Sequence, residues 1–209
     1  MEKKSKMNIT STNSEDERNT SNYTKWILIT KKFEIVGRLE HPEIALKLLI
    51  SDDISEAFGY YSQLEISNNE RKLIQKEVFD EAIIEVEKLT KTLDSELKFT
   101  MVYQPHWHEG VIGIVASKLV DAYKVPSLVF TDASDEGIIK ASIRSAGTLN
   151  IFECLNECKD LFIKFGGHKA AAGLSMPKEN FSKLFESLDI KLSNVPEIIR
   201  MNQRRVDID

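Results

Sequence analysis

The stretch FTMVYQPHWHEGVIGIVASKLVDAYKVPSLVFT, residues 99–131, decides the fold class. Its first five residues, 99–103, are mostly apolar or β-branched and predict a strand. Residues 110–123 are apolar almost all round and long enough to form a buried helix. A second strand is predicted over residues 125–131, with Pro126 near its start, where a missing amide donor is tolerated. A strand, a helix and another strand in this order predict a sheet that is at least partly parallel.

Further strands and helices follow in the same alternation. Residues 138–144 predict a third strand, and residues 170–176 predict a fourth. Asn150 is placed to cap a helix that reaches Phe162, and Pro177 is placed to open a last amphipathic helix. The chain is therefore predicted to be an α/β protein whose mixed, partly parallel sheet is covered by helices.

Two short helices and one long helix are predicted before the sheet. Pro42 suits the first turn of the first helix, and Ser51-Asp52-Asp53 ends it and caps the second. Ser67-Asn68-Asn69-Glu70 has the spacing of a capping box, and apolar residues then recur every three or four positions. A connector helix over residues 67–97 would be about 45 Å long. Its charged outer face predicts that it runs along the surface or bridges two domains.

Composition excludes several classes of protein. The chain has 209 residues and a formal net charge of −5, which excludes a strongly basic nucleic-acid binder but not a local basic pocket. Cys154 and Cys158 are too few for a disulfide framework, and we expect buried reduced thiols rather than zinc ligands. The sequence has neither an apolar run long enough to span a membrane nor a secretion signal. It therefore predicts a cytoplasmic protein without a membrane partner.

The first candidate site lies where the first strand gives way to its helix, at the edge where open α/β sheets bind ligands. His106 and His108 flank Trp107 there, beside helix amides that suit an anion. Gly110 and Gly113 share a helix face with Ala116, a pattern typical of close packing rather than of phosphate ligands. A metalloprotease zinc site is excluded, because no second histidine follows four residues after the first.

The second candidate site is the strand that carries Ser142 and Arg144. With a strand period of two, these residues project from one face, while Ala141 and Ile143 project from the other. A hydroxyl and a guanidinium on one face suit a phosphate, which accepts paired hydrogen bonds from arginine. The alternative is an edge strand with a solvated face.

The third candidate site is the segment Phe165-Gly166-Gly167-His168, followed by a run of small residues. The two glycines free the backbone and expose amides, and His168 is able to donate to an anion. Taken alone, His168 is better explained as a structural histidine than as an anion ligand. Together with the Ser-x-Arg strand, it favours an anion pocket.

Three segments in this order resemble motifs of the DHH-associated domain of the DHH phosphoesterases, in particular of the RecJ family of single-strand-specific DNA exonucleases. They are WHEGVIGIVAS (107–117), SIRS (142–145) and FGGHKAAAGL (165–174). Two further segments, NER (69–71) and GRL (37–39), resemble the connector of that family and the segment before it. The resemblance implies five regions. The first two are a disordered polar tail (1–25) and a remnant helical segment (26–66) with a candidate strand at 26–30. The connector helix (67–97), the DHH-associated domain (98–190) and a C-terminal extension (191–209) follow.

The resemblance also implies a substrate site but no catalytic residue and no metal ligand in this chain. The family holds two manganese or magnesium ions in an N-terminal half, with an Asp-His-His motif that this sequence lacks. The associated domain grips the substrate. By this resemblance the residues that bind backbone phosphate are Ser142, Arg144 and Ser145. The same pocket is lined by Gly166, Gly167 and His168, and His108 lies near it.

The sequence thus leads to one main hypothesis and two alternatives. The main hypothesis is the phosphate-binding part of a single-stranded-DNA-specific 5′–3′ exonuclease of DNA repair and recombination. It would be inactive alone, would bind single-stranded DNA or short oligonucleotides, and would work with a separate catalytic chain. One alternative is a non-catalytic nucleotide-binding or scaffold protein. The other is a truncated relic that associates with itself through exposed apolar surface.

Overall fold

A computed structural model describes residues 42–93 and 96–201, in two compact units that meet between Arg71 and Lys72. The predicted polar tail, the candidate strand at 26–30 and the end of the C-terminal extension lie outside the described residues. Each unit is described by itself.

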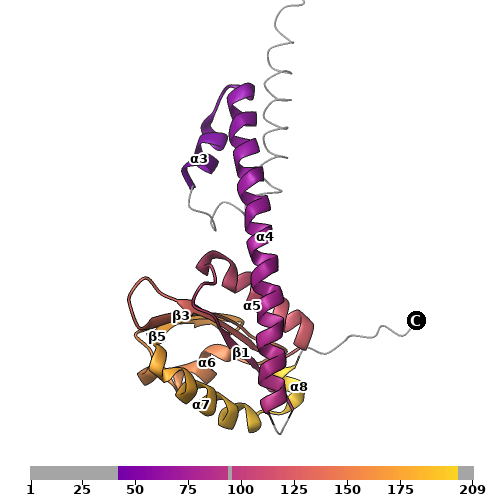
Figure 1. Ribbon diagram of the computed structural model, residues 1–209, viewed down its shortest axis with the longest axis vertical. Helices are drawn as coiled ribbons and strands as arrows, with labels where there is room; N and C mark the ends of the chain where they lie inside the picture. Colours follow the sequence, from indigo (N-terminus) through magenta and orange to yellow (C-terminus); the bar gives the residue numbers. More distant parts are fainter. Residues whose placement is uncertain (1–41, 94–95, 202–209) are drawn as a thin grey trace, which may run out of the picture. The chain divides into compact units, whose positions relative to one another are not determined.

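The first unit packs two helices against each other. These are α3, Pro42–Ile50, and the beginning of α4, Ile54–Thr92 (Figure 1). Ala45 and Leu48 from α3 are buried with Ala57 and Leu64 from α4. The predicted break between the helices is confirmed, because the backbone N–H of Glu56 donates to Asp53 Oδ1 over 2.9 Å and caps the new helix.

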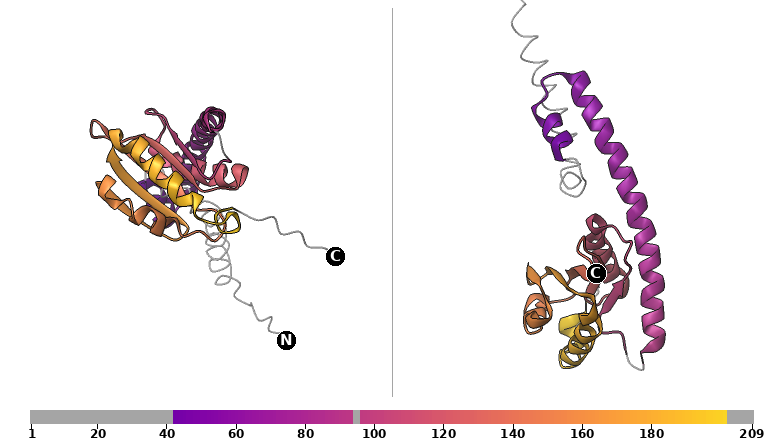
Figure 2. Two further views of the ribbon diagram at one scale, coloured as in Figure 1. Left: turned by 90° about the horizontal axis from the view of Figure 1, so that it is seen from below. Right: turned by 60° about the vertical axis from the view of Figure 1, so that its left-hand side comes forward.

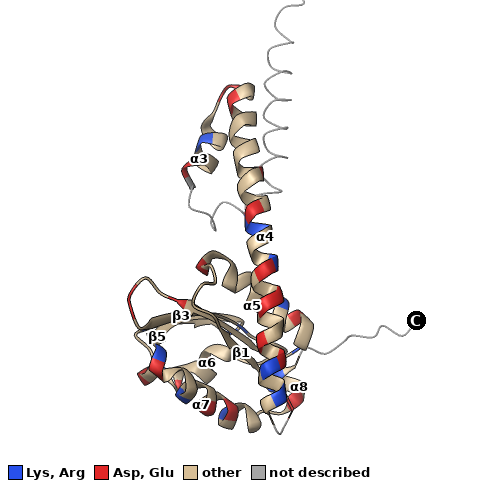
Figure 3. Cartoon of the chain, viewed as in Figure 1, with Lys and Arg blue, Asp and Glu red and all other residues tan. Residues whose placement is uncertain are grey.

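The helix α4 continues without interruption through the predicted capping box, so the helix start expected at Ser67 is wrong. Asn68 is buried in the helix, and its side-chain oxygen accepts a hydrogen bond from Arg71 Nη2 at 3.0 Å. A capping box marks a place where a helix is able to begin, but only a breaker such as glycine or proline stops the turns before it. Acidic and basic residues recur along α4 (Figure 3), and Lys72, Lys76 and Glu77 among them are exposed, so the predicted charged outer face is confirmed.

The second unit is built on a five-stranded sheet with the strand order β1-β2-β3-β5-β4 (Figure 1). The strands are β1, Thr100–Tyr103; β2, Ser127–Asp132; β3, Ile138–Arg144; β4, Lys164–His168; and β5, Ala171–Pro177. β1 and β2 are parallel, and the other three pairings are antiparallel. The predicted mixed, partly parallel sheet covered by helices is therefore confirmed.

One strand was missing from the sequence prediction. Residues 164–168 form β4, although no strand was predicted around their glycine pair. Gly166 and Gly167 pair with Gly173 and Ala172 of β5, so the partner strand holds them in a ladder that their own propensity disfavours.

The two faces of the sheet are covered to different extents (Figures 1 and 2). Helices α6, Ile151–Asn156, and α7, Phe181–Ser193, pack on one face over a core that includes Phe130, Ile139 and Leu174. On the other face, α5, Glu109–Tyr123, and the later turns of α4 pack over β1 and β2. On this second face, Gly166 of β4 and Gly173 of β5 are exposed.

The last helices differ from the prediction at their boundaries. α6 ends at Asn156, short of the expected Phe162, and a 3₁₀ turn at Lys159–Leu161 follows it. Pro177 ends β5 instead of opening a helix, and the 3₁₀ turn Lys178–Asn180 leads into α7. The short helix α8, Glu197–Arg200, closes the described chain. None of the helices in the described residues is long and apolar enough to cross a membrane.

Candidate phosphate-binding site

Two of the sequence motifs meet through β5 on the second face of the sheet. We name it the open face, because its glycines on β4 and β5 are exposed. Arg144 pairs with Ala171, which pairs with His168, and Ser142 pairs with Gly173. Residues directly opposite each other in antiparallel strands project from the same face. The guanidinium of Arg144 and the ring of His168 therefore start from positions about 9–10 Å apart, two strand spacings, on one surface.

The middle of this surface is a row without long side chains. Ser142, Gly173 and Gly166 lie side by side on β3, β5 and β4. A Cβ atom built on Gly166 would meet no heavy atom within 4 Å, and one on Gly173 would come no closer than 3.7 Å to Ala141 O. The space above both glycines is therefore open, and a ligand is able to approach the backbone closely.

The predicted alternation along β3 is confirmed, and the edge-strand alternative is wrong. Ile139, Ala141 and Ile143 are buried, whereas Ser142 and Arg144 on the other face are half-buried. β3 lies in the middle of the sheet between β2 and β5. A guanidinium on a central strand is held more rigidly than one on a solvated edge.

Arg144 and Ser142 are positioned by each other and by α5. Arg144 Nη1 donates to Ser142 Oγ at 3.1 Å and to Ile143 O at 2.8 Å. Gly113 of α5 packs against both side chains, and a Cβ there would lie 2.9 Å from Ser142 Oγ and 3.1 Å from Arg144 Nη2. Gly113 is thus a packing residue, as the sequence indicated, and what it makes room for is the pair of phosphate-binding candidates.

His168 is oriented by the turn between β4 and β5. Its Nδ1 accepts a hydrogen bond from the Ala170 N–H at 3.3 Å, and the side chain is exposed. In the neutral ring an accepting Nδ1 leaves the proton on Nε2, which is then a donor suited to an anion. Gly167, beside it, has φ +152, and a Cβ there would lie 2.5 Å from Ala171 O, so a side chain at this position would be strained.

Ser145 and Gly167 lie at the border of this surface. Ser145 follows β3, where its N–H donates to Ala170 O at 2.9 Å and its hydroxyl donates to Leu149 O at 2.8 Å. The first bond ties the end of β3 to the residue before β5, and the second holds the turn after β3. Gly167 pairs with Ala172, and both residues belong to the opposite, buried face of the sheet. Gly167 therefore contributes its backbone to the border and has no position on the open face.

His108 lies towards the opposite end of β3 from Arg144. It caps α5 by accepting from the Gly110 N–H with Nδ1 at 3.1 Å, which again leaves Nε2 as the donor in the neutral ring. Its neighbour Glu109 forms an ion pair with Lys140, four residues before Arg144 on the same face. The structure therefore places His108 beside the Lys140 end of the surface.

A partly exposed contact that the sequence did not reveal holds the segment before α5. Glu81 of α4 accepts a hydrogen bond from Trp107 Nε1 at 2.8 Å and lies 2.9 Å from His106 Nε2. The hydrogen bond from Trp107 is the main cause that lowers the pKa of the Glu81 carboxyl. Desolvation raises this pKa by less than the Trp107 bond lowers it, and the contact with His106 lowers it further. Thr131 Oγ1 completes the anchor by donating to Trp107 O at 2.5 Å. His106 thus helps to fix the loop.

The donors on this surface suit an anion and not a divalent cation. They are a guanidinium, a hydroxyl and imidazole N–H groups, whereas manganese and magnesium need several carboxylate or carbonyl oxygens. Within residues 42–93 and 96–201, no three His, Cys, Asp or Glu side chains gather to hold a metal ion. Cys154 and Cys158 are free thiols, and burial raises the pKa of both.

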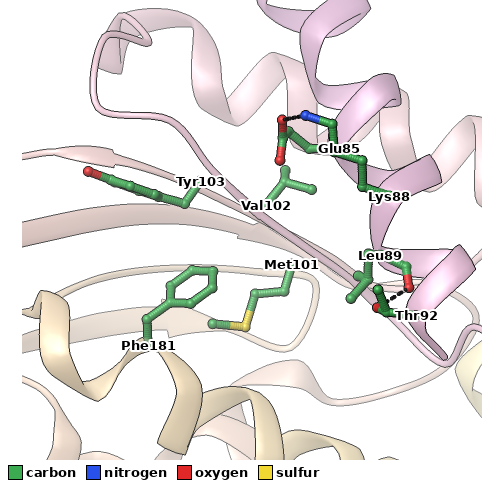
Figure 4. A pocket seen from close by; sticks show the side chains of 8 residues that line it. All are labelled: Glu85, Lys88, Leu89, Thr92, Met101, Val102, Tyr103 and Phe181. Carbon is green, nitrogen blue, oxygen red and sulfur yellow. Dashed lines mark hydrogen bonds and ion pairs between the residues drawn. The ribbon is translucent and has the colours of Figure 1, made fainter.

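A hollow of about 300 Å³ lies elsewhere, between α4, β1 and α7 (Figure 4). Met101, Val102 and Phe181 contribute to its apolar lining, and Lys88 and Glu85 form an ion pair at its rim. None of the predicted site residues lines it.

Comparison with known proteins finds the same domain. A family model for the DHHA1 domain matches residues 95–194. RecJ of Bacillus subtilis, a single-stranded-DNA-specific exonuclease, is 37% identical over 161 residues, which are 77% of this chain and 20% of that protein. RecJ of Escherichia coli is 35% identical over 159 residues, 74% of this chain and 27% of that protein.

Solved structures agree with the sequence matches. The crystal structure of RecJ from Thermus thermophilus in complex with Mn²⁺ has a TM-score of 0.66 and 30% sequence identity, over 79% of this chain and 24% of that one. The chain spans no more than 30% of the length of the curated relatives it matches. The resemblance expected from the three motifs is thereby confirmed: residues 95–194 match the DHHA1 domain, and the chain is similar to part of the RecJ exonucleases.

Proposed function

We propose that this domain binds the phosphates of single-stranded nucleic acid through Ser142, Arg144 and His168. The observation that carries the proposal is the convergence of a guanidinium, a hydroxyl and an imidazole on one open, glycine-lined face of the sheet. Arginine and serine donate well to phosphate oxygens, and the small middle row admits the sugar–phosphate backbone to the sheet. The similarity to proteins named single-stranded-DNA-specific exonucleases supports DNA as the ligand.

In this proposal the chain supplies substrate binding to a 5′–3′ exonuclease of DNA repair and recombination. Cleavage would depend on manganese or magnesium, held by residues other than those the structure describes, on this polypeptide or on a separate catalytic chain. Such ions generate the attacking hydroxide and neutralise charge on the phosphoryl oxygens. We expect no cleavage by the 209-residue chain alone.

Fluorescence anisotropy with a short 5′-labelled single strand tests the proposal, with and without manganese. Arg144→Ala should weaken binding tenfold or more, because a hydrogen bond to a charged group is worth about 1.5–3 kcal/mol and about 1.4 kcal/mol is tenfold in affinity. Arg144→Lys should restore binding only in part, since lysine keeps the charge but not the planar fork. The control is Lys183→Ala, which removes an exposed cation from α7 on the covered face.

The same samples are then run on a gel to detect shortened strands. Manganese-dependent digestion by this chain, lost in Arg144→Ala, would show that it is a complete nuclease and not a binding part. Equal affinity of the parent and Arg144→Ala for the strand would refute the phosphate site itself. The alternative function, a non-catalytic nucleotide binder, predicts binding that never stimulates cleavage when the catalytic domain of a RecJ relative is added.

A further inference from the structure

A pair of lysines also lies on the open face, four residues along β3 and β4 from Arg144 and His168. Lys140 of β3 pairs with Ser175 of β5, which pairs with Lys164 of β4. The three side chains project from the same face as Arg144 and His168, because residues four apart in a strand share a face. The two lysines therefore flank a small residue of β5, as Arg144 and His168 flank another.

The two lysines differ in their present contacts. The side chain of Lys164 is exposed and forms no hydrogen bond or ion pair with another residue in the described ranges. Lys140 forms an ion pair with Glu109, the first residue of α5. The Glu109 side chain is 60% exposed and that of Lys140 is 29% exposed, so the carboxylate is accessible at the surface and a phosphate is able to displace it.

The spacing of the two pairs fixes the kind of ligand that touches both. Four residues of a strand span about 13 Å, and the middle row between the pairs has no long side chain. One phosphate cannot reach both pairs, whereas an extended chain of several nucleotides presents a phosphate to each. A mononucleotide would use one pair only.

We propose that Lys164 and Lys140 form a second phosphate-binding position. It binds a different phosphate of the same oligonucleotide from the one bound by Arg144 and His168. This inference rests on the proposed function, because it extends the same surface along the sheet. It makes the domain selective for oligonucleotides over mononucleotides.

Isothermal titration calorimetry with thymidine 5′-monophosphate and with 5′-phosphorylated tetrathymidylate tests this position. Lys164→Ala should weaken tetranucleotide binding about threefold to fivefold, the size expected of an exposed ion pair, and leave mononucleotide binding unchanged. It should also reduce the salt slope of tetranucleotide binding by about 0.7, the value for one phosphate contact on a single strand. Glu109→Gln should strengthen tetranucleotide binding, because Lys140 loses its competing carboxylate.

Lys183→Ala is the matched control, and thermal melting verifies that each variant is folded. The inference is overturned if Lys164→Ala leaves the tetranucleotide unaffected, weakens both ligands equally, or matches Lys183→Ala. If Arg144→Ala weakens tetranucleotide binding and Lys164→Ala does not, the second position is overturned and the proposed function stands. If the parent binds neither ligand, the proposed function fails together with it.

Discussion

Substitution of Gly113 by alanine tests the site without removing any of its functional groups. Gly113 lies on α5 against the two candidate phosphate ligands of β3. An added Cβ would lie 2.9 Å from Ser142 Oγ and 3.1 Å from Arg144 Nη2, both closer than ordinary contact allows. Ser142 Cβ, at 3.7 Å, is not crowded. The methyl group must therefore displace the ends of these two side chains.

The expected cost falls on binding rather than on folding. Alanine in place of glycine stabilises a helix interior by about 0.8–1 kcal/mol, whereas overpacking costs about 1–3 kcal/mol. The crowded atoms are ends of flexible side chains, so the overpacking cost should be near its lower limit. The free energy of unfolding should then change by about 1 kcal/mol or less. Loss of one hydrogen bond from Arg144 to phosphate weakens binding tenfold to about a hundredfold.

Urea unfolding and oligonucleotide anisotropy on the same samples separate these effects. Gly59→Ala is the control, because Gly59 is also in a helix and a Cβ there meets nothing within 4 Å. It should stabilise the protein by about 1 kcal/mol and leave binding unchanged. In an Arg144→Ala background, Gly113→Ala should have little further effect on affinity. Gly113→Ala protein that is folded and binds as tightly as the parent would refute the argument that α5 sets the positions of Ser142 and Arg144.

Two further predictions concern the contacts around the site. Glu81→Gln should lower the free energy of unfolding by more at pH 7 than at pH 3. Contacts with Trp107 and His106 lower the carboxyl pKa below 4.5, so its stabilisation is fully present above that pH and is lost as the pH falls through the folded-state pKa. An equal effect of Glu81→Gln at both pH values would contradict this. Cys154 and Cys158 should react slowly with a thiol reagent at pH 7 and rapidly in urea, because burial raises the pKa of both thiols; rapid reaction of the folded protein would exclude it.

The local part of the fold follows from the order of the residues. The strand period of two along residues 138–144 correctly placed Ser142 and Arg144 opposite Ala141 and Ile143, because apolar alternation reports which face meets the core. The break at residues 51–53 was also predicted correctly, since Asp53 caps a helix through a contact three residues away. These features depend on neighbours in the chain.

Where the prediction failed, a distant contact outweighed a local preference. The glycine pair of 166–167 gave no signal of a strand, yet β5 pairs with it and makes it one. The capping box at Ser67 did not begin a helix, because nothing before it stopped the preceding turns. The contact of His106 and Trp107 with Glu81 joins residues 25 and 26 positions apart, and no periodicity reveals it.

The chemistry of the candidate site can be read from the order of the residues: a hydroxyl and a guanidinium on one strand face, a histidine after paired glycines, and motifs that resemble the DHHA1 domain. Pairing between distant strands is what brings these groups to one surface. β5 lies between β3 and β4, although it comes last of the three in the chain, and its register sets Arg144 level with His168. Strand order and register arise from pairing between distant segments, whereas periodicity specifies only the face from which each side chain projects.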